Sequence, residues 1–366
     1  MTRVVAIILH AVPGPGAGPL ERSFAGARAE NAANQARGFA AAGAEPVTVE
    51  TFAGDEPFGR RLRTLARAQR GSGLVVLGSG SIPLATAFDR ARFVAAAAGD
   101  VTGDSPAILV NNRYSSDIVA IPPGVDLKEL PDLAGDNAVP RWLAGRGVEV
   151  EDLHRRWRLQ VDLDSPLDVI ISSPGNPGAA MGRGPAGSLG RGTEHAERLM
   201  PLMARIRTTT ADPTAELLVA GRTSSDTLHW LERHTASRTR ALIEERGMKT
   251  AGHAQRATCS TLGLLLDRDG PGAFGDILAM LSDAAVVDTR VLMAHRFGRD
   301  EASWPSAEDR FASDLLLPEA VHDPWLRAIT SAAVAAPIPI LLGGHTLVGP
   351  GLRLVVGAAR PGRYGS

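Results

Sequence analysis

Hydrophobic residues in the first half of the chain form short continuous runs, separated by longer segments in which they recur every three or four positions. The runs are typical of buried strands, and the longer segments have the period of helices that face a core. The predicted strands cover residues 4–10, 45–51, 73–78, 106–112 and 116–122. The predicted helices cover residues 20–42, 60–70 and 87–98. Strands that alternate with helices indicate βαβ units, so this half predicts an α/β fold with a mostly parallel sheet in three layers.

The second half of the chain also has an α/β pattern. Residues 215–222 read as a strand, residues 223–249 as one or two helices, and residues 260–270 as another strand and turn. Two further buried segments cover residues 283–298 and 337–357. The pattern therefore predicts a second α/β domain.

A segment rich in Gly, Pro, Ala and Ser separates the two halves. It begins SSPGNPG at residue 172 and contains almost nothing that a core could bury. A chain of 366 residues is long enough for two ordinary cores. We therefore predict a first domain at residues 1–173, a linker at residues 174–192 and a second domain, of unknown role, at residues 193–366.

Charge and cysteine content exclude several classes of function. The chain has 39 basic and 40 acidic residues, so no overall field attracts it to nucleic acid or to an anionic membrane. Cys259 is the sole cysteine, which excludes an intrachain disulfide framework and a multi-cysteine metal site and favours a cytoplasmic location. The apolar run near the start is too short to span a bilayer and is interpreted as the first strand. The oligomeric state stays open.

Lysine is nearly absent, and this restricts how the chain can hold a phosphate. Lys128 and Lys249 are the only lysines, so the first hundred residues contain none and a Walker-type loop is excluded there. Arginine binds phosphate well because its guanidinium can donate two parallel hydrogen bonds. Arg22, Arg28 and Arg113 are therefore the candidates for offsetting phosphate charge in the first domain.

The segment LQVDLDSPLDVI, at residues 159–170, holds several acidic residues close together. Asp162 and Asp164 would lie on the same face of an extended strand, where like charges are unfavourable unless a cation or donor offsets them. Contact with a metal or ligand is one interpretation. The other is that Asp164, which precedes Ser165 and Pro166, caps a turn or helix through backbone N–H groups.

The second half contains its own candidate residues at the ends of predicted strands. Asp288 and Arg290 lie in an apolar run, where a buried acid and base need each other or a ligand. His345 lies in the Gly-rich turn GGHTLVGPG, and Arg222 follows another strand. Because strand ends commonly host sites in α/β sheets, a small-molecule pocket and an internal ion pair both remain open. Asp314 is interpreted as a turn cap.

Three stretches of the first half together resemble one family. They are GSGLVVLGSGSIPLATAFDRARFVAAA, SPAILVNNRYSSDIVAIPP and LQVDLDSPLDVI, which match a central strand with its metal loop, a later strand pair that reads a base or substrate, and a closing acidic segment. In this order they resemble nucleotidyltransferases of the glycosyltransferase-A-type fold, in particular 2-phospho-L-lactate guanylyltransferases and molybdenum-cofactor guanylyltransferase-like proteins. The resemblance covers residues 1–173.

The resemblance implies a magnesium ion that bridges the phosphates of a nucleoside triphosphate, with Asp162 and Asp164 as its metal-binding and catalytic carboxylates. The chain departs from the family at two places. The central loop GSGSIP has no carboxylate before its Ile-Pro, and the loop after the first strand has no lysine.

Several side chains could contact the nucleotide. Ser79 and Ser81 lie in a Gly-rich loop that could bind an anion through N–H and hydroxyl groups, or could simply form a tight turn. Asn111 and Arg113 could read a base or phosphate, or could belong to an ordinary turn. His10, at the end of the first strand, could approach the site or be a hydrogen-bonded core residue.

Three functions follow from these alternatives. The first is nucleotidyl transfer from a nucleoside triphosphate to a small phosphorylated or hydroxylated acceptor, so that the partner is a small-molecule nucleotide or phosphorylated metabolite. The second is a non-catalytic scaffold or sensor. The third is an enzyme whose active site lies around Asp288, Arg290 and His345. The first requires Asp162 or Asp164 to lie beside the loop at residues 78–81.

Overall fold

The computed structural model describes residues 2–52, 56–100, 107–133, 135–173, 189, 193–245 and 257–357, which form two compact units. The first unit contains residues up to Gly16 and the segment Ala25–Asp162. The second contains Ala17–Phe24 and the described residues from Leu163 onward. The division therefore falls earlier than the predicted limit at residue 173. Of the predicted linker at residues 174–192, only Leu189 is among the described residues.

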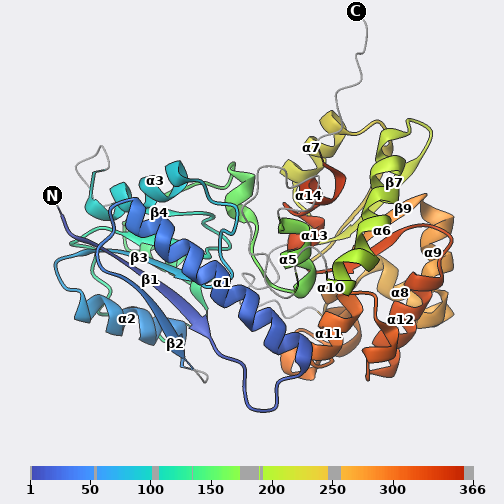
Figure 1. The fold of residues 1–366 in the computed structure, drawn as a ribbon, viewed down its shortest axis with the longest axis horizontal. Helices are drawn as coiled ribbons and strands as arrows, with labels where there is room; N and C mark the ends of the chain where they lie inside the picture. Colours follow the sequence, from blue (N-terminus) through green and yellow to red (C-terminus); the bar gives the residue numbers. More distant parts are fainter. Residues whose placement is uncertain are drawn as a thin grey trace, which may run out of the picture. The chain divides into compact units, whose positions relative to one another are not determined.

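The first unit contains a six-stranded sheet with the order β2-β1-β3-β5-β4-β6 (Figure 1). The strands are β1 (Val4–Ala11), β2 (Val47–Phe52), β3 (Gly73–Gly78), β4 (Ala107–Val110), β5 (Ile118–Ile121) and β6 (Glu149–Asp152). β5 pairs antiparallel with both β3 and β4, whereas the other pairs are parallel. The expected α/β class and mostly parallel sheet are confirmed.

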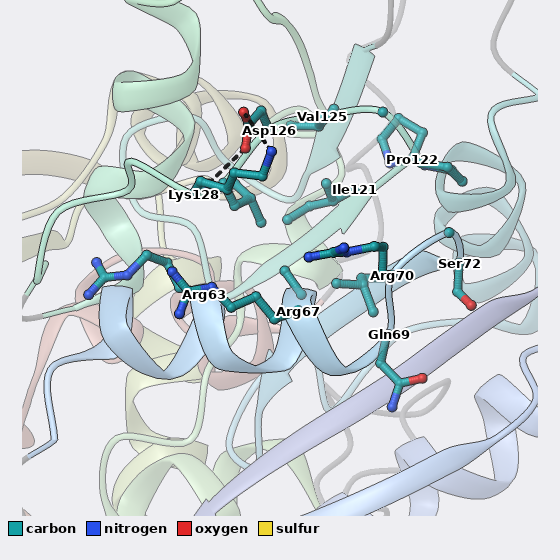
Figure 2. Close-up of a pocket in the computed structure, with 16 residues that line it drawn as sticks. Arg63, Arg67, Gln69, Arg70, Ser72, Ile121, Pro122, Val125, Asp126 and Lys128 are labelled. Atoms are coloured by element: carbon teal, nitrogen blue, oxygen red, sulfur yellow. Dashed lines mark hydrogen bonds and ion pairs between the residues drawn. The ribbon is translucent and has the colours of Figure 1, made fainter.

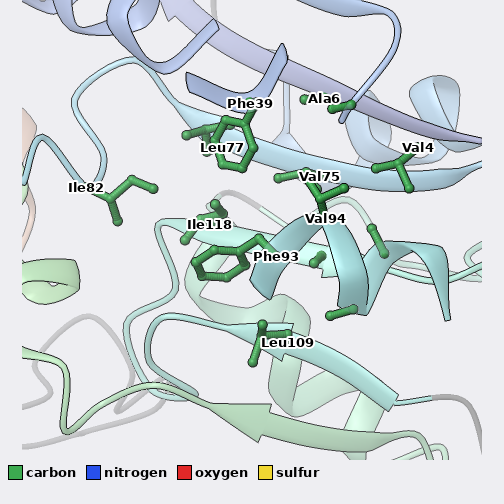
Figure 3. Close-up of a cluster of buried hydrophobic side chains, with 14 of the residues drawn as sticks. Val4, Ala6, Phe39, Val75, Leu77, Ile82, Phe93, Val94, Leu109 and Ile118 are labelled. Carbon is green, nitrogen blue, oxygen red and sulfur yellow. The ribbon is translucent and has the colours of Figure 1, made fainter. Parts of the chain in front are cut away.

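Helices cover both faces of this sheet. They are α1 (Pro19–Ala41), α2 (Phe58–Ala68), α3 (Ala87–Ala98) and α4 (Val139–Ala144), with short 3-10 turns at Asp136–Ala138 and Trp157–Gln160. Alternate residues of β1 enter different cores, because successive side chains of a strand point to opposite faces. Ala6 belongs to the same buried cluster as Phe39 of α1 and Phe93 of α3 (Figure 3). Ile7 belongs to the opposite cluster, with Leu62 of α2.

The second unit has a fully parallel four-stranded sheet with the order β10-β9-β7-β8. Its strands are β7 (Glu216–Gly221), β8 (Arg238–Ile243), β9 (Ala284–Asp288) and β10 (Ile340–Gly343). Its helices are α5 (Pro166–Ser172), α6 (Glu194–Ala211), α7 (Ser225–His234), α8 (Thr261–Asp269), α9 (Phe274–Leu281), α10 (Thr289–Phe297), α11 (Ala307–Asp314), α12 (Pro324–Ala335), α13 (His345–Val348) and α14 (Leu352–Val356). This confirms the expected α/β character of the second half.

The structure corrects three local predictions. Residues 159–169 are not one extended strand, because Ser165 caps α5 by accepting a hydrogen bond from Asp168 N–H, and Pro166 occupies the first helical position. Residues 260–270 form helix α8 instead of a strand and turn, because Ser260 caps them. Residues 223–245, the described part of the region 223–249, contain one helix, α7, and then the edge strand β8.

Candidate functional site

The loop after β3 lies at the carboxyl end of the first unit's parallel strands, and helix α1 holds it in place. Asn31 Nδ2 donates hydrogen bonds to the carbonyl oxygens of Ser79 at 2.8 Å and Ser81 at 3.1 Å. Gln35 Nε2 donates to the carbonyl oxygen of Ile82 at 2.8 Å. Ile82 is fully buried with φ at 45°. A left-handed conformation is unfavourable for a β-branched residue, so the surrounding contacts hold this loop in a strained shape.

A histidine and an arginine adjoin this loop. His10 lies near the end of β1, and its Nδ1 shares a 3.0 Å hydrogen bond with Ser79 Oγ. Burial, together with the positive charge of Arg28 on α1, lowers the pKa of His10. The imidazole is therefore mainly uncharged near pH 7.

Asp162 lies beside this loop, which is the position that the nucleotidyl-transfer hypothesis requires of Asp162 or Asp164. Its backbone pairs with that of Ser81 in an isolated antiparallel bridge. Ser81 Oγ also donates a 2.9 Å hydrogen bond to the carbonyl oxygen of Asp117, the residue before β5. Asp117 was not a candidate from sequence, and it brings a second carboxylate to the edge where Asp162 lies.

Asn111 connects Asp117 with the segment that leads to Asp162. Its Nδ2 donates to Asp117 Oδ2 and to the carbonyl oxygen of Leu159, each at 2.9 Å. Its Oδ1 accepts a hydrogen bond from Asp117 N–H at 3.0 Å. Asn111 is fully buried, so its amide positions the two acidic segments and is not exposed to a ligand.

The other side chains that were predicted to contact the nucleotide lie in different surroundings. The hydroxyl groups of Ser79 and Ser81 are hydrogen-bonded within the fold, to His10 and to Asp117. Arg113 lies in the turn between β4 and β5, pairs with Asp152 at 3.0 Å and is exposed. Arg22 belongs to the second unit, where it donates to the carbonyl oxygen of Ala17.

Asp164 is exposed and belongs to the second unit, whereas Asp162 belongs to the first. The prediction that Asp164 caps a helix is wrong, because Ser165 is the N-cap of α5. Asp164 N–H instead donates a 3.1 Å hydrogen bond to Asp168 Oδ2.

A second candidate site lies at the carboxyl end of the second unit's sheet. Asp288, the last residue of β9, is fully buried and accepts two hydrogen bonds from the side chain of Arg222, from Nε at 2.6 Å and from Nη2 at 3.1 Å. Burial raises the pKa of a carboxyl, but the charge and hydrogen bonds of Arg222 outweigh it and hold the pKa of Asp288 below its usual range. The sequence singled out Arg222 as a residue after a strand, but it did not identify Asp288 as its partner.

Arg290 forms the second buried ion pair of this site. Its Nη1 and Nη2 donate to the two carboxylate oxygens of Asp314 at 2.5 and 2.6 Å. The expected side-chain pair between Asp288 and Arg290 is therefore wrong, because each has another partner. The interpretation of Asp314 as a turn cap is also wrong, since its carboxylate is completely buried against Arg290.

Asp168 is a buried acid that the sequence did not single out. Its Oδ2 accepts hydrogen bonds from Ser165 Oγ at 2.9 Å and from Asp164 N–H. Its Oδ1 is buried and has no hydrogen-bond partner among the described residues. Burial and the nearby negative charge of Asp164 raise the pKa of Asp168 well above its usual range. The repeated Asp in LQVDLDSPLDVI was the one available signal.

His345 opens α13, and Gly344 alone separates it from the end of β10. It is half-buried, and its charge is one of the influences that lower the pKa of Asp288. Arg290 and His345 thus both influence the charge state of Asp288, whereas a small-molecule pocket around the three residues stays a prediction.

Within the described residues, no group of three or more His, Cys, Asp or Glu side chains is arranged to hold a metal ion. The magnesium ion therefore remains a prediction. Of the helices that the structure describes, none is long and apolar enough to cross a membrane. Neither a protein-family model nor a curated protein matches the chain.

Proposed function

We propose that the first unit binds a nucleoside triphosphate at the carboxyl edge of its sheet and transfers the nucleotidyl group to a small phosphorylated or hydroxylated acceptor. In this reaction a bond forms between an acceptor oxygen and the α-phosphorus, and the bond to the departing pyrophosphate breaks. The observation that carries the proposal is the bridge between Asp162 and Ser81, which brings an acidic segment to the loop after β3.

Arg28 supplies the charge that this reaction needs where the chain has no lysine. Its positive charge is one of the influences that lower the pKa of His10, which is hydrogen-bonded to Ser79 of the loop after β3, and this supports assigning the phosphate charge to Arg28. A guanidinium placed there stabilises the negative charge of phosphate oxygens. His10 is held by Ser79 and adds little positive charge near pH 7, so it serves to orient the loop.

The residues at this edge have the chemistry to hold magnesium. Magnesium usually takes one or two protein carboxylates, with water and substrate phosphates as its other ligands. Asp162 and Asp117 supply two carboxylates on segments joined by Asn111 and Ser81. When bound, the ion would neutralise charge on the phosphates. The role of the chain is to fix the acidic segments and the loop before the nucleotide arrives.

The strained loop supports a role in binding. Ile82 keeps its left-handed backbone because Gln35 holds its carbonyl oxygen and the core holds its side chain. Such strain costs about 1–3 kcal/mol and tends to occur where backbone groups must be positioned for function.

A thermal-shift screen of nucleoside triphosphates, with and without magnesium, tests the proposal. A ligand that binds the folded protein raises its unfolding midpoint. We expect at least one nucleotide to raise the midpoint of the wild-type protein with magnesium, and Asp162→Asn and Arg28→Gln to lose most of this shift.

Matched controls separate the site from general charge effects. Asp100→Asn changes an exposed acid of the first unit, and Arg37→Gln changes an exposed arginine of α1. Both should keep the full shift. If no nucleotide shifts any of these proteins, nucleotide binding at this edge is wrong. Binding without pyrophosphate release for any acceptor in a panel of phosphorylated and hydroxylated compounds would favour the scaffold or sensor.

A second candidate function is an enzyme site in the second unit. The specific observation is Asp168, whose buried Oδ1 has no partner among the described residues and whose raised pKa favours a protonated carboxyl. Such a carboxyl can donate a proton or hydrogen bond to a small polar substrate. The test is a metabolite screen in which Asp168→Asn abolishes a thermal shift that Asp162→Asn leaves unchanged. The absence of any such metabolite would remove this candidate.

A further inference from the structure

A basic cavity lies in the first unit, away from the residues proposed to bind the nucleotide. Its volume is about 440 Å³, and it is lined by the end of α2, the turn after this helix and the loop after β5 (Figure 2). Leu74, at the start of β3, and Ile121, at the end of β5, are strand neighbours in its wall.

The cavity lies at the amino-terminal end of β3, whereas the proposed nucleotide site lies at the carboxyl end of the same strand. β3 enters the cavity wall at Leu74 and reaches the nucleotide loop after Gly78. These two positions are about 13 Å apart, because each strand residue advances the chain by about 3.3 Å. A ligand in the cavity and a nucleotide at the other edge therefore occupy different sites.

Four basic side chains line the cavity, with Asp126 as the acidic residue among the described lining. Two of these bases have partners. Arg63 pairs with Asp132 at 2.5 Å, and Lys128 Nζ is 4.0 Å from Asp126 Oδ2. Lys128 is one of the two lysines in the whole chain.

Arg67 and Arg70 differ from the other two bases. Both are exposed, and among the described residues neither has a hydrogen-bond or ion-pair partner. Arg67 lies in the last turn of α2, and Arg70 lies just after the end of this helix. Two guanidinium groups at one cavity can together hold an anion with two or more charges, because each can donate parallel hydrogen bonds.

The wall of the cavity is apolar. Leu74, Ile121 and Leu127 are buried, and Val125 is partly buried. A ligand that contacts this wall needs a carbon skeleton as well as an anionic group. The volume lies within the ~300–1,000 Å³ typical of small-molecule sites.

No aromatic side chain is present among the described residues that line the cavity. Proteins that bind single-stranded nucleic acid usually stack the bases on aromatic rings. The lining therefore favours a small anion over a nucleic acid. From the free arginines, the apolar wall and the volume, we infer that this cavity binds a small phosphorylated metabolite, with its phosphate held by Arg67 and Arg70.

Isothermal titration of the full chain tests this site, with pyrophosphate and ribose 5-phosphate as probes and with EDTA to exclude magnesium. We expect both probes to bind the wild-type protein. We expect the double variant Arg67→Gln/Arg70→Gln to bind them about tenfold more weakly or worse, because it removes both guanidinium groups that donate charge-assisted hydrogen bonds to the phosphate. Both side chains are exposed, so the variant should unfold at the same temperature as the wild type without ligand.

Two comparisons make the test specific. Arg37→Gln/Arg155→Gln removes the same charge from exposed positions of the first unit outside the cavity, and it should leave affinity nearly unchanged. Arg28→Gln should also leave it unchanged, whereas it should weaken nucleotide binding at the other edge. The inference is overturned if neither probe binds, if both double variants weaken binding equally, or if Arg28→Gln abolishes binding while the cavity variant retains it. Tighter binding of a single-stranded oligonucleotide than of ribose 5-phosphate would also overturn it.

Discussion

Arg290 and Asp314 form a buried pair whose two members depend on each other. Both carboxylate oxygens of Asp314 accept hydrogen bonds from Arg290, and the Asp314 side chain has no exposed surface. Asp314→Ala leaves the guanidinium buried without this partner, so we expect a loss of about 3–5 kcal/mol in the free energy of unfolding, measured by urea titration. Asp269→Ala breaks a surface pair with Arg268 and should change stability little. Equal effects of the two variants would contradict this account.

Asp168 gives a prediction about pH. Its pKa is higher in the folded protein than in the unfolded chain, so the folded state binds the proton more tightly. The contribution of Asp168 to stability therefore declines as pH rises from about 3.9, the unfolded value, towards the raised folded value. Asparagine cannot ionise, so Asp168→Asn should gain stability relative to the wild type between pH 4 and pH 7.

Urea unfolding of both proteins at these two pH values measures the difference. Asp100→Asn makes the same chemical change at an exposed position and is the control. A stability difference between Asp168→Asn and the wild type that stays constant with pH would show that folding does not raise the pKa of Asp168.

For single side chains, the sequence could identify residues near a site but could not identify their ion-pair partners. Asp288, Arg290 and His345 were recognised because they follow apolar runs, and polar residues at strand ends often gather at one edge of a sheet. The partner of Asp288 is 66 residues away along the chain, and that of Arg290 is 24 away. Nothing in a local pattern specifies such pairings. Asp168 was missed because its burial depends on packing around α5.

Helix α3 begins with a reciprocal cap that fixes where the chain leaves the loop after β3. Thr86 Oγ1 accepts a hydrogen bond from Asp89 N–H, and the Asp89 carboxylate accepts one from Thr86 N–H at 2.9 Å. Thr86→Ala should lower the free energy of unfolding by about 1 kcal/mol in urea titration. Thr64→Ala, at an exposed position within α2, should be neutral or slightly stabilising because alanine favours helices. A reversed order of the two variants would be inconsistent with the cap.

The packing of α3 on β3 requires a residue without a side chain at Gly73. A Cβ built there would lie 1.9 Å from the carbonyl oxygen of Ala97, which is backbone and cannot move aside easily. Gly73→Ala should therefore destabilise the first unit by about 1–3 kcal/mol. Gly26→Ala in α1 meets no atom within 4 Å and should stabilise by about 0.5–1 kcal/mol. Thermal unfolding of the two variants checks these opposite signs, and a tolerated Gly73→Ala would disprove the close approach.

Elements with both a clear period and local end signals were predictable. β1 and β3 are continuous apolar runs buried on both faces, and α3 starts and ends where its pattern does. α8 was mistaken for a strand because LGLLL is a short apolar run, which period alone cannot assign. β8 was read as helix because RTRALI is partly exposed, and its pairing with β7 decides its conformation.

The molecule as a whole contains two α/β units, each with polar residues at the carboxyl edge of its own sheet. The sequence could predict this organisation because each unit repeats the strand and helix alternation. It could not predict that Asp162 and Asp164 fall in different units, because the division follows long-range contacts. The effects of Asp162→Asn and Asp168→Asn on ligand binding should therefore be separable.

The central claim is that the first unit binds a nucleotide through Asp162 and Arg28. The most direct measurement is the dissociation constant of the best nucleotide from the thermal-shift screen, determined by isothermal titration with and without magnesium. We predict magnesium-dependent binding by the wild-type protein and by Asp100→Asn, and affinity at least about tenfold weaker for Asp162→Asn and for Arg28→Gln. Equal affinity of Asp162→Asn and the wild type in magnesium would contradict the claim.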